Sequence, residues 1–220
     1  MNLKILSSNL KGISEKDKGF KELVALITKL KPDIILFQEI RTKSNKSKIL
    51  SLLQKKFSFL QSEYIIYFDF SKDYGKGILQ LIQEFEGLGI LSKYKFDSEK
   101  INLPIIKGLD RWPRILIKYK FNNFSICNLH LSKYDKSREL EIKKIPKADI
   151  YAGDFNMEPY EINKFFPKDK ISYNLSKYIS YPSKNLTLDY FVLKKGEFVR
   201  FKCIPTKFSD HSALFAEINI

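Results

Sequence analysis

The sequence predicts an α/β protein in which largely antiparallel sheets form a sandwich within one domain, residues 1–220. Apolar runs of strand length alternate with segments of helical periodicity, and a hairpin pattern lies among them. The 220 residues are enough to bury a large core, and a hydrophobic fraction of 44% excludes wholesale disorder. No internal repeat, low-complexity linker or change in composition divides the chain.

The first half of the chain begins with a strand, a helix and a second strand. Residues 4–9 form a short strand that ends at Asn9, and apolar residues recur at helical spacing over 20–30. The continuous apolar run 33–39 closes with Glu39 and predicts a central strand covered on both faces. Beyond it we expect a basic surface helix at 43–56, β segments at 57–60 and 64–67, a loop at 71–77, and strands at 78–83 and 89–92.

The second half predicts a hairpin and three further strands. Residues 115–121 and 124–131 alternate like paired strands, with Asn122-Asn123 as the two-residue turn. An apolar strand at 148–152 ends at Gly153. We expect helices at 135–145 and after Pro159, strands at 188–192 and 213–218, an irregular stretch at 95–110 and an exposed connection at 194–202.

The formal net charge of +14 suggests a polyanionic partner, either nucleic acid or an anionic membrane surface. Only five of the 39 basic residues are arginine, and such a lysine bias can also arise from codon composition. The N-terminus is too polar for a signal peptide and no apolar run is long enough to cross a bilayer, so we expect no stable membrane association. Cys127 and Cys203 lie in apolar segments as expected of free thiols in a cytoplasmic protein.

Polar side chains gather where the predicted strands end. Taken singly, each has a structural explanation as a turn residue, a helix cap or a core histidine. Together they supply the carboxylates, amides and imidazoles suited to metal-assisted phosphoester hydrolysis. Because side chains alternate along a strand, Asp154 and Asn156 are expected to face one way while Phe155 packs the other way. The complete set is Asn9, Glu39, His130, Asp154, Asn156, Asp189, Asp210 and His211.

The expected chemistry explains these residue types. Mg²⁺ or Mn²⁺ binds hard oxygen ligands, a role that Glu39 and Asn9 fit. A phosphodiester also needs a water held in line, a base for its proton, and stabilisation of the charge in the transition state. Histidine handles protons near neutral pH when a carboxylate fixes its tautomer and orientation.

The ordered set of motifs resembles the endonuclease/exonuclease/phosphatase superfamily, also called DNase I-like. Each short motif is weak alone, but seven in the same order, spanning nearly the whole chain, are specific. The similar segments are Asn9, Leu36-Phe37-Gln38-Glu39, Gly89-Ile90-Leu91-Ser92, Asn128-Leu129-His130-Leu131, Gly153-Asp154-Phe155-Asn156, Leu188-Asp189-Tyr190-Phe191 and Ser209-Asp210-His211.

The resemblance implies a four-layered α-β-β-α sandwich of two packed, mostly antiparallel sheets, and a cofactor that is Mg²⁺ or Mn²⁺. It implies that Glu39 is the principal metal ligand, with Asn9 and Asp210 contributing directly or through water. Arg114 resembles a basic residue that lies near the phosphate, and Arg111 competes for the same role.

The resemblance also implies roles for the remaining site residues. His211 becomes the general base or a partner of the transition state, oriented by Asp189. Asp154 and Asn156 position the attacking water and the phosphate. His130 contacts the phosphate or acts as the general acid.

The expected activity is that of a monomeric nuclease that cuts nucleic acid, with DNA favoured. Lys11 stands where abasic-site endonucleases usually carry aspartate, so that specialised activity is disfavoured. One alternative is a phospholipid head group or small phosphoester as substrate, as in sphingomyelinases. Another is an inactive relative that only binds nucleic acid, although His130 and His211 with their carboxylates speak against it.

Overall fold

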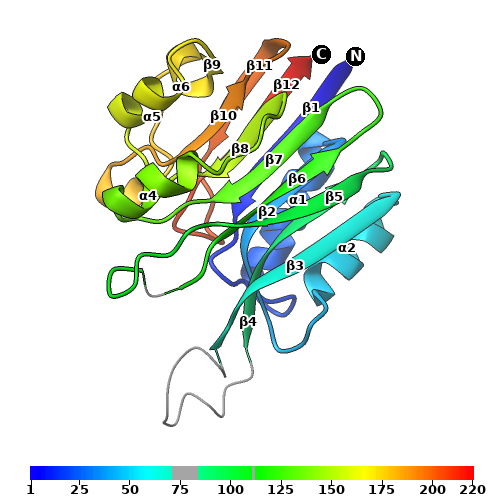
Figure 1. Ribbon diagram of the computed structural model, residues 1–220. Coiled ribbons are helices and arrows are strands. Elements are labelled where there is room, and N and C mark those ends of the chain that lie inside the picture. Colours follow the sequence, from blue (N-terminus) through cyan, green and yellow to red (C-terminus); the bar gives the residue numbers. More distant parts are fainter. Residues whose placement is uncertain (71–83, 111) are drawn as a thin grey trace.

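The computed structural model describes residues 1–70, 84–110 and 112–220, in which two six-stranded sheets pack face to face (Figure 1). Each sheet contains one parallel pair, β1–β2 in the first and β7–β8 in the second, and the other pairs are antiparallel. The first sheet has the order β11 (Glu197–Ile204), β12 (Ala213–Asn219), β1 (Asn2–Asn9), β2 (Ile34–Thr42), β4 (Phe85–Ser92), β3 (Gln61–Asp69). The second has the order β5 (Asp97–Asn102), β6 (Ile115–Lys120), β7 (Ser125–His130), β8 (Ile150–Asp154), β10 (Asp189–Leu193), β9 (Lys170–Ile171).

Helices cover the outer face of each sheet, which completes the predicted α-β-β-α sandwich (Figure 1). In β1, Ile5 packs between the sheets, whereas Leu6 packs beneath the helices, so both faces of the strand are buried. Helices α1 (Lys18–Leu30) and α2 (Lys48–Phe57) cover the first sheet; α4 (Asp135–Ile142), α5 (Pro159–Phe165) and α6 (Ser172–Leu175) lie on the side of the second. Among the described residues, no helix is long and apolar enough to span a membrane.

Three edge strands were not predicted: the two-residue β9 and the longer strands β5 and β11. β5 lies within the stretch expected to be irregular, and β11 occupies most of the connection expected at 194–202. Both β5 and β11 pair on one side only and carry mainly exposed or half-exposed residues, so neither has the buried face that gives a strand its apolar alternation.

The expected β segment at 57–60 was wrong because α2 continues through Phe57, and the expected helix at 43–56 begins only at Lys48. The loop and strand predicted at 71–77 and 78–83 lie outside the described residues.

A pair of buried amides joins the two sheets directly beneath the site. The Asn128 side chain on β7 donates hydrogen bonds to the backbone oxygens of Phe37 (3.1 Å) and Gly89 (3.2 Å) on the first sheet. In return, Gln38 Nε2 donates to Asn128 Oδ1 over 2.8 Å. Asn128 and Gln38 are fully buried, so these hydrogen bonds fix the relative position of the two sheets.

Candidate active site

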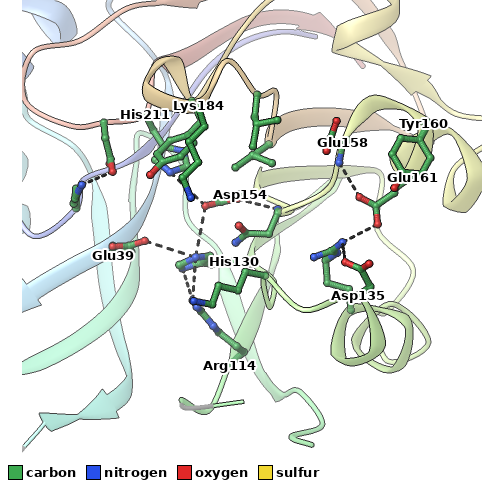
Figure 2. Close-up of a pocket in the computed structure, with 18 residues that line it drawn as sticks. Glu39, Arg114, His130, Asp135, Asp154, Glu158, Tyr160, Glu161, Lys184 and His211 are labelled. Atoms are coloured by element: carbon green, nitrogen blue, oxygen red, sulfur yellow. Dashed lines mark hydrogen bonds and ion pairs between the residues drawn. The ribbon is translucent and has the colours of Figure 1, made fainter. Parts of the chain in front are cut away.

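A cavity of about 620 Å³ collects most of the predicted site residues (Figure 2). The predicted residues that line it are Glu39, Arg114, His130, Asp154, Asn156, Asp210 and His211. Asn9 and Asp189 lie behind this lining and are hydrogen-bonded to it. Arg111 lies outside the described residues.

Glu39 is presented by an irregularity in β2. The pairing with β4 shifts register between Phe37 and Ile40, and Glu39 has a φ of 49° in the left-handed region. The strand was expected to end at Glu39, which was wrong, since it resumes and continues to Thr42. The Gly12 N–H donates to the Glu39 backbone oxygen over 3.0 Å, so the loop after β1 helps to hold the irregularity in place.

Asp154 ends β8 one residue later than predicted. Gly153, at φ 136°, approaches β7 so closely that a Cβ would lie 2.0 Å from the backbone oxygen of Leu129, and only glycine fits there. Asp154 Oδ1 accepts a hydrogen bond from the Asn156 N–H (2.9 Å), and Asn156 Nδ2 donates to the Leu131 backbone oxygen (2.9 Å). Both Asp154 and Asn156 line the cavity, on the common side predicted from strand alternation.

The carboxylates from the two sheets meet at Asn9. Its Nδ2 lies 3.0 Å from Glu39 Oε1 and 3.3 Å from Asp154 Oδ2. His130 Nε2 lies 3.7 Å from that Glu39 oxygen and 3.6 Å from that Asp154 oxygen. Burial, reinforced by Glu86, raises the pKa of Glu39, and burial with Asp189 raises the pKa of Asp154 to about 7.

The two histidines have opposite electrostatic surroundings. His211 Nδ1 lies 2.8 Å from Asp189 Oδ2 and its Nε2 lies 3.8 Å from Asp154 Oδ2. Burial favours neutral His211, but the carboxylates of Asp189 and Asp154 outweigh it and raise its pKa to about 10. Burial, together with the positive charge of Arg114, holds the pKa of His130 well below its usual value. These surroundings favour the protonated form of His211 and the neutral form of His130.

Tyr67 and Glu86 were missed by sequence reasoning, whereas their neighbour Arg114 was predicted. Arg114 Nη1 lies 2.8 Å from His130 Nδ1, and Tyr67, whose hydroxyl lies 3.4 Å from that nitrogen, donates to Glu86. Glu86 is the second residue of β4, at its amino end, whereas the predicted residues were chosen at the carboxyl ends of strands. Glu86 alternates with Leu88, which faces the space between the sheets, and a carboxylate in that series is a signal that could have found it.

The donor set fits a divalent cation. The ligand atoms of Glu39, His130 and Asp154 lie within 4.8 Å of one another, as do those of Asp154, Asp189 and His211. The half-buried carboxylate of Glu39 and the buried carboxylate of Asp154, both with raised pKa values, offer the oxygen ligands and the negative charge that Mg²⁺ or Mn²⁺ would neutralise. Asp210 lines the same cavity but belongs to neither group, and its carboxylate pairs with Lys11.

The profile of the Endonuclease/Exonuclease/phosphatase family matches residues 6–211. The chain belongs to this family. A comparison with curated protein sequences finds no match, whereas solved structures show the same fold at low identity. An endonuclease/exonuclease/phosphatase from Beutenbergia cavernae is similar with a TM-score of 0.75 and 12% identity, over 100% of this chain and 72% of that one.

Two other family structures show how widely proteins of this fold differ in their named activities. A mannosyl-6-phosphatase from Bacteroides thetaiotaomicron has a TM-score of 0.69 and 17% identity, over 99% of this chain and 100% of that chain. A 3′ phosphatase from Neisseria, bound to a product DNA hairpin, has a TM-score of 0.66 and 14% identity, with coverage of 99% and 100%. At these identities the likeness shows the fold, and the substrate has to be argued from the site.

Proposed function

We propose that this family member is a Mg²⁺- or Mn²⁺-dependent phosphodiesterase that hydrolyses nucleic acid, with DNA favoured. The observation that carries the proposal is a second cavity of about 490 Å³, which is lined by several basic residues. Gly12 and Arg41 line this second cavity, next in sequence to Lys11 and near Glu39, which line the first. Its exposed basic residues are Lys16, Arg41, Lys43, Lys46 and Lys48.

A chain of phosphates fits this arrangement better than a single phosphate does. The acidic cluster can act on one phosphate, and the neighbouring basic cavity can bind further phosphates of the same molecule. The net charge of +14 adds a general attraction for a polyanion.

The roles of the residues follow from the geometry. Glu39 and Asp154 would hold the metal, which would supply the Lewis-acid chemistry that polarises a phosphate and stabilises its developing charge. Protonated His211, held by Asp189, stabilises the negative charge on the phosphate oxygens, while Arg114 adds a second positive charge on the other side of His130. Asp154, whose Oδ1 accepts a hydrogen bond from the Asn156 N–H, lies with Asn156 where the pair can position the attacking water.

The first test uses purified protein and end-labelled linear DNA and RNA oligonucleotides, with Mg²⁺, Mn²⁺ or EDTA. We expect metal-dependent shortening that Glu39→Gln and His211→Ala each reduce by about 100-fold or more. Glu99→Gln, a change at an exposed glutamate on β5, is the matched control and should cut normally. Equal cutting by all variants would identify a contaminant and refute the proposal.

The same preparation distinguishes the second candidate function. A phosphatase or phosphodiesterase of a small phosphoester is favoured by the acidic residues at the far end of the first cavity, which suit hydroxyl groups better than phosphates. Cleavage of bis(p-nitrophenyl) phosphate without cleavage of any oligonucleotide would support it. Nucleic-acid cleavage should instead weaken steeply as salt rises, because many phosphate contacts are lost together.

A further inference from the structure

Among the described residues, a single hydrogen bond holds the ring of His211, although its backbone is fixed on both sides. The His211 backbone oxygen accepts from Thr206 Oγ1 (2.8 Å), and its N–H donates to Ser209 Oγ (3.1 Å). At the ring, Nδ1 lies 2.8 Å from Asp189 Oδ2, whereas Nε2 lies 3.8 Å from Asp154 Oδ2, beyond hydrogen-bond distance. A ring with one hydrogen bond can still tilt about that bond, so its orientation depends on what else packs against it.

Tyr181 packs against the His211 ring. The centroids of the two rings lie 4.8 Å apart, with an angle of 42° between the ring planes. This separation lies in the range over which pairs of rings attract one another. Both side chains line the first cavity, where His211 is buried and Tyr181 is half-buried. Tyr181 therefore restricts the tilt that the hydrogen bond to Asp189 leaves free.

The Tyr181 ring can act as a fixed surface because a tight hairpin holds its backbone. Tyr181 and Leu186 form an antiparallel bridge in which each N–H donates to the backbone oxygen of the other, over 2.9 Å and 3.2 Å. A short helical turn, Pro182–Lys184, and Asn185 at φ 57° connect the two residues of the bridge. The proline fixes its own φ, which further limits the conformations of the turn. The tyrosine side chain is thus presented to the cavity from a rigid segment.

One buried serine, Ser180, ties this hairpin to the segments that carry Asp189 and His211. Its Oγ accepts hydrogen bonds from two consecutive backbone N–H groups, the second of which is that of Asp189 (3.0 Å). Its backbone oxygen accepts from the N–H of Ser212 (2.7 Å), the residue after His211. Ser180 is fully buried, so water does not compete for these hydrogen bonds. Tyr181, the next residue, is therefore fixed relative to both members of the Asp189–His211 pair.

We propose that Tyr181 is a positioning residue that orients the His211 ring for its role at the phosphate. This inference rests on the proposed function, in which His211, held by Asp189, stabilises the charge on the phosphate oxygens. Tyr181 acts through His211 and not through a contact with the nucleotide, so its effect should be the same for every phosphodiester that the enzyme hydrolyses. Orientation matters because a misplacement of about 1 Å at a reacting group can cost roughly 100-fold in rate.

The first test compares kcat and KM of Tyr181 variants on a single-stranded oligonucleotide and on bis(p-nitrophenyl) phosphate. Tyr181→Ala should lower kcat on both substrates by roughly tenfold to 100-fold and leave KM within about twofold of the parent value. Tyr181→Phe keeps the ring and should retain the kcat of the parent. Tyr94→Ala, at a half-buried tyrosine that lines neither cavity, is the matched control and should leave kcat unchanged. A rise in KM on the oligonucleotide alone would indicate a substrate contact and overturn the proposal.

A double-mutant cycle tests whether Tyr181 acts through His211. Residues in contact that serve one step are not additive, whereas independent residues add within about twofold. Tyr181→Ala should therefore cause no further loss of activity in a protein that already carries His211→Ala. The same loss as in the parent protein would show that Tyr181 acts independently of His211, and the proposal would be wrong.

NMR spectroscopy tests the ring contact without any activity. The chain has two histidines, His130 and His211, so one substitution assigns the ring signals of both. Tyr181→Ala should shift the His211 signals, because the ring current of the tyrosine is lost, and leave those of His130 in place. Unchanged His211 signals would refute the contact. If the parent protein hydrolysed neither substrate, the proposed function would fail and the role of Tyr181 with it, while the ring contact would still be visible by NMR.

Discussion

The amide bridge between the sheets provides a direct test of how the candidate site is held together. Replacing Asn128 by alanine removes three hydrogen bonds, two to the backbone oxygens of Phe37 and Gly89 and one from Gln38. All four residues are buried or lie in central strands, so water cannot fully replace the lost partners. Each such loss costs about 1–3 kcal/mol when a buried partner is left unpaired.

The backbone carbonyls of Phe37 and Gly89 have other hydrogen-bond partners available in the sheet. We therefore expect the free energy of unfolding to fall by an amount near the low end of the sum for three hydrogen bonds, about 3–5 kcal/mol. That is a large part of the roughly 5–15 kcal/mol that stabilises an ordinary protein. For a chain of this length each kcal/mol lowers Tm by about 2–4 °C, so Tm should fall by about 10 °C. Urea and thermal unfolding followed by circular dichroism measure the change.

The matched control for this measurement is Asn123→Ala, in the exposed turn that joins the same strand, β7, to β6. It should change the free energy of unfolding by no more than about 0.5 kcal/mol. If Asn128→Ala cost less than about 1 kcal/mol, the bridge would not be holding the sheets together and the reasoning would be refuted.

Three further predictions concern the site and its surroundings. Asp189→Asn removes the carboxylate that orients His211 and should lower kcat about 100-fold; an unchanged kcat would contradict the assigned role. Burial raises the pKa of Glu141 to about 7, so the native state binds the extra proton and stability should fall as pH rises from about 4.5 to 7. Urea unfolding at pH 5 and pH 8 should show this fall disappear in Glu141→Gln and persist in the exposed control Glu139→Gln. Finally, Mg²⁺ should raise Tm in the parent protein but not in Glu39→Gln, and an equal shift in both would show that the cation binds elsewhere.

The layered fold could be predicted because a central strand that is covered on both faces has a continuous run of apolar residues, and this run is visible in the sequence. The apolar run before Glu39 is continuous since β2 is covered by the other sheet on one face and by helices on the other. The edge strands β5 and β11 show no comparable apolar pattern in their sequences. Their pairing depends on β6 and β12 rather than on a buried face of their own. Charged residues protect such edges from further pairing and at the same time hide them from a search for apolar alternation.

The site could be located because most of its side chains leave the ends of strands, and strand ends are visible in the sequence. His130 and Asp154 are the last residues of adjacent strands in the same sheet, paired in register, so their proximity follows from the topology. The irregularity of β2 at Glu39 could not be predicted from the sequence in the same way. It consists of a register shift against β4 and a positive φ at a glutamate, neither of which has a sequence signature in β2 itself.

The cluster of Asp135, Arg138 and Glu161 in the wall of the first cavity lay furthest beyond the reach of sequence reasoning, and the cause is physical. Asp135 and Glu161 belong to helices separated by the whole of β8, and each by itself is an unremarkable charge in a first helical turn. What joins them is Arg138, a residue whose burial is possible only because both carboxylates reach it. A charged residue inside a helix predicts a solvated face unless its partners are known, and here the partners come from two different helices. The fold thus joins three ordinary helical charges into one fixed surface that lines the same cavity as Glu39 and Asp154.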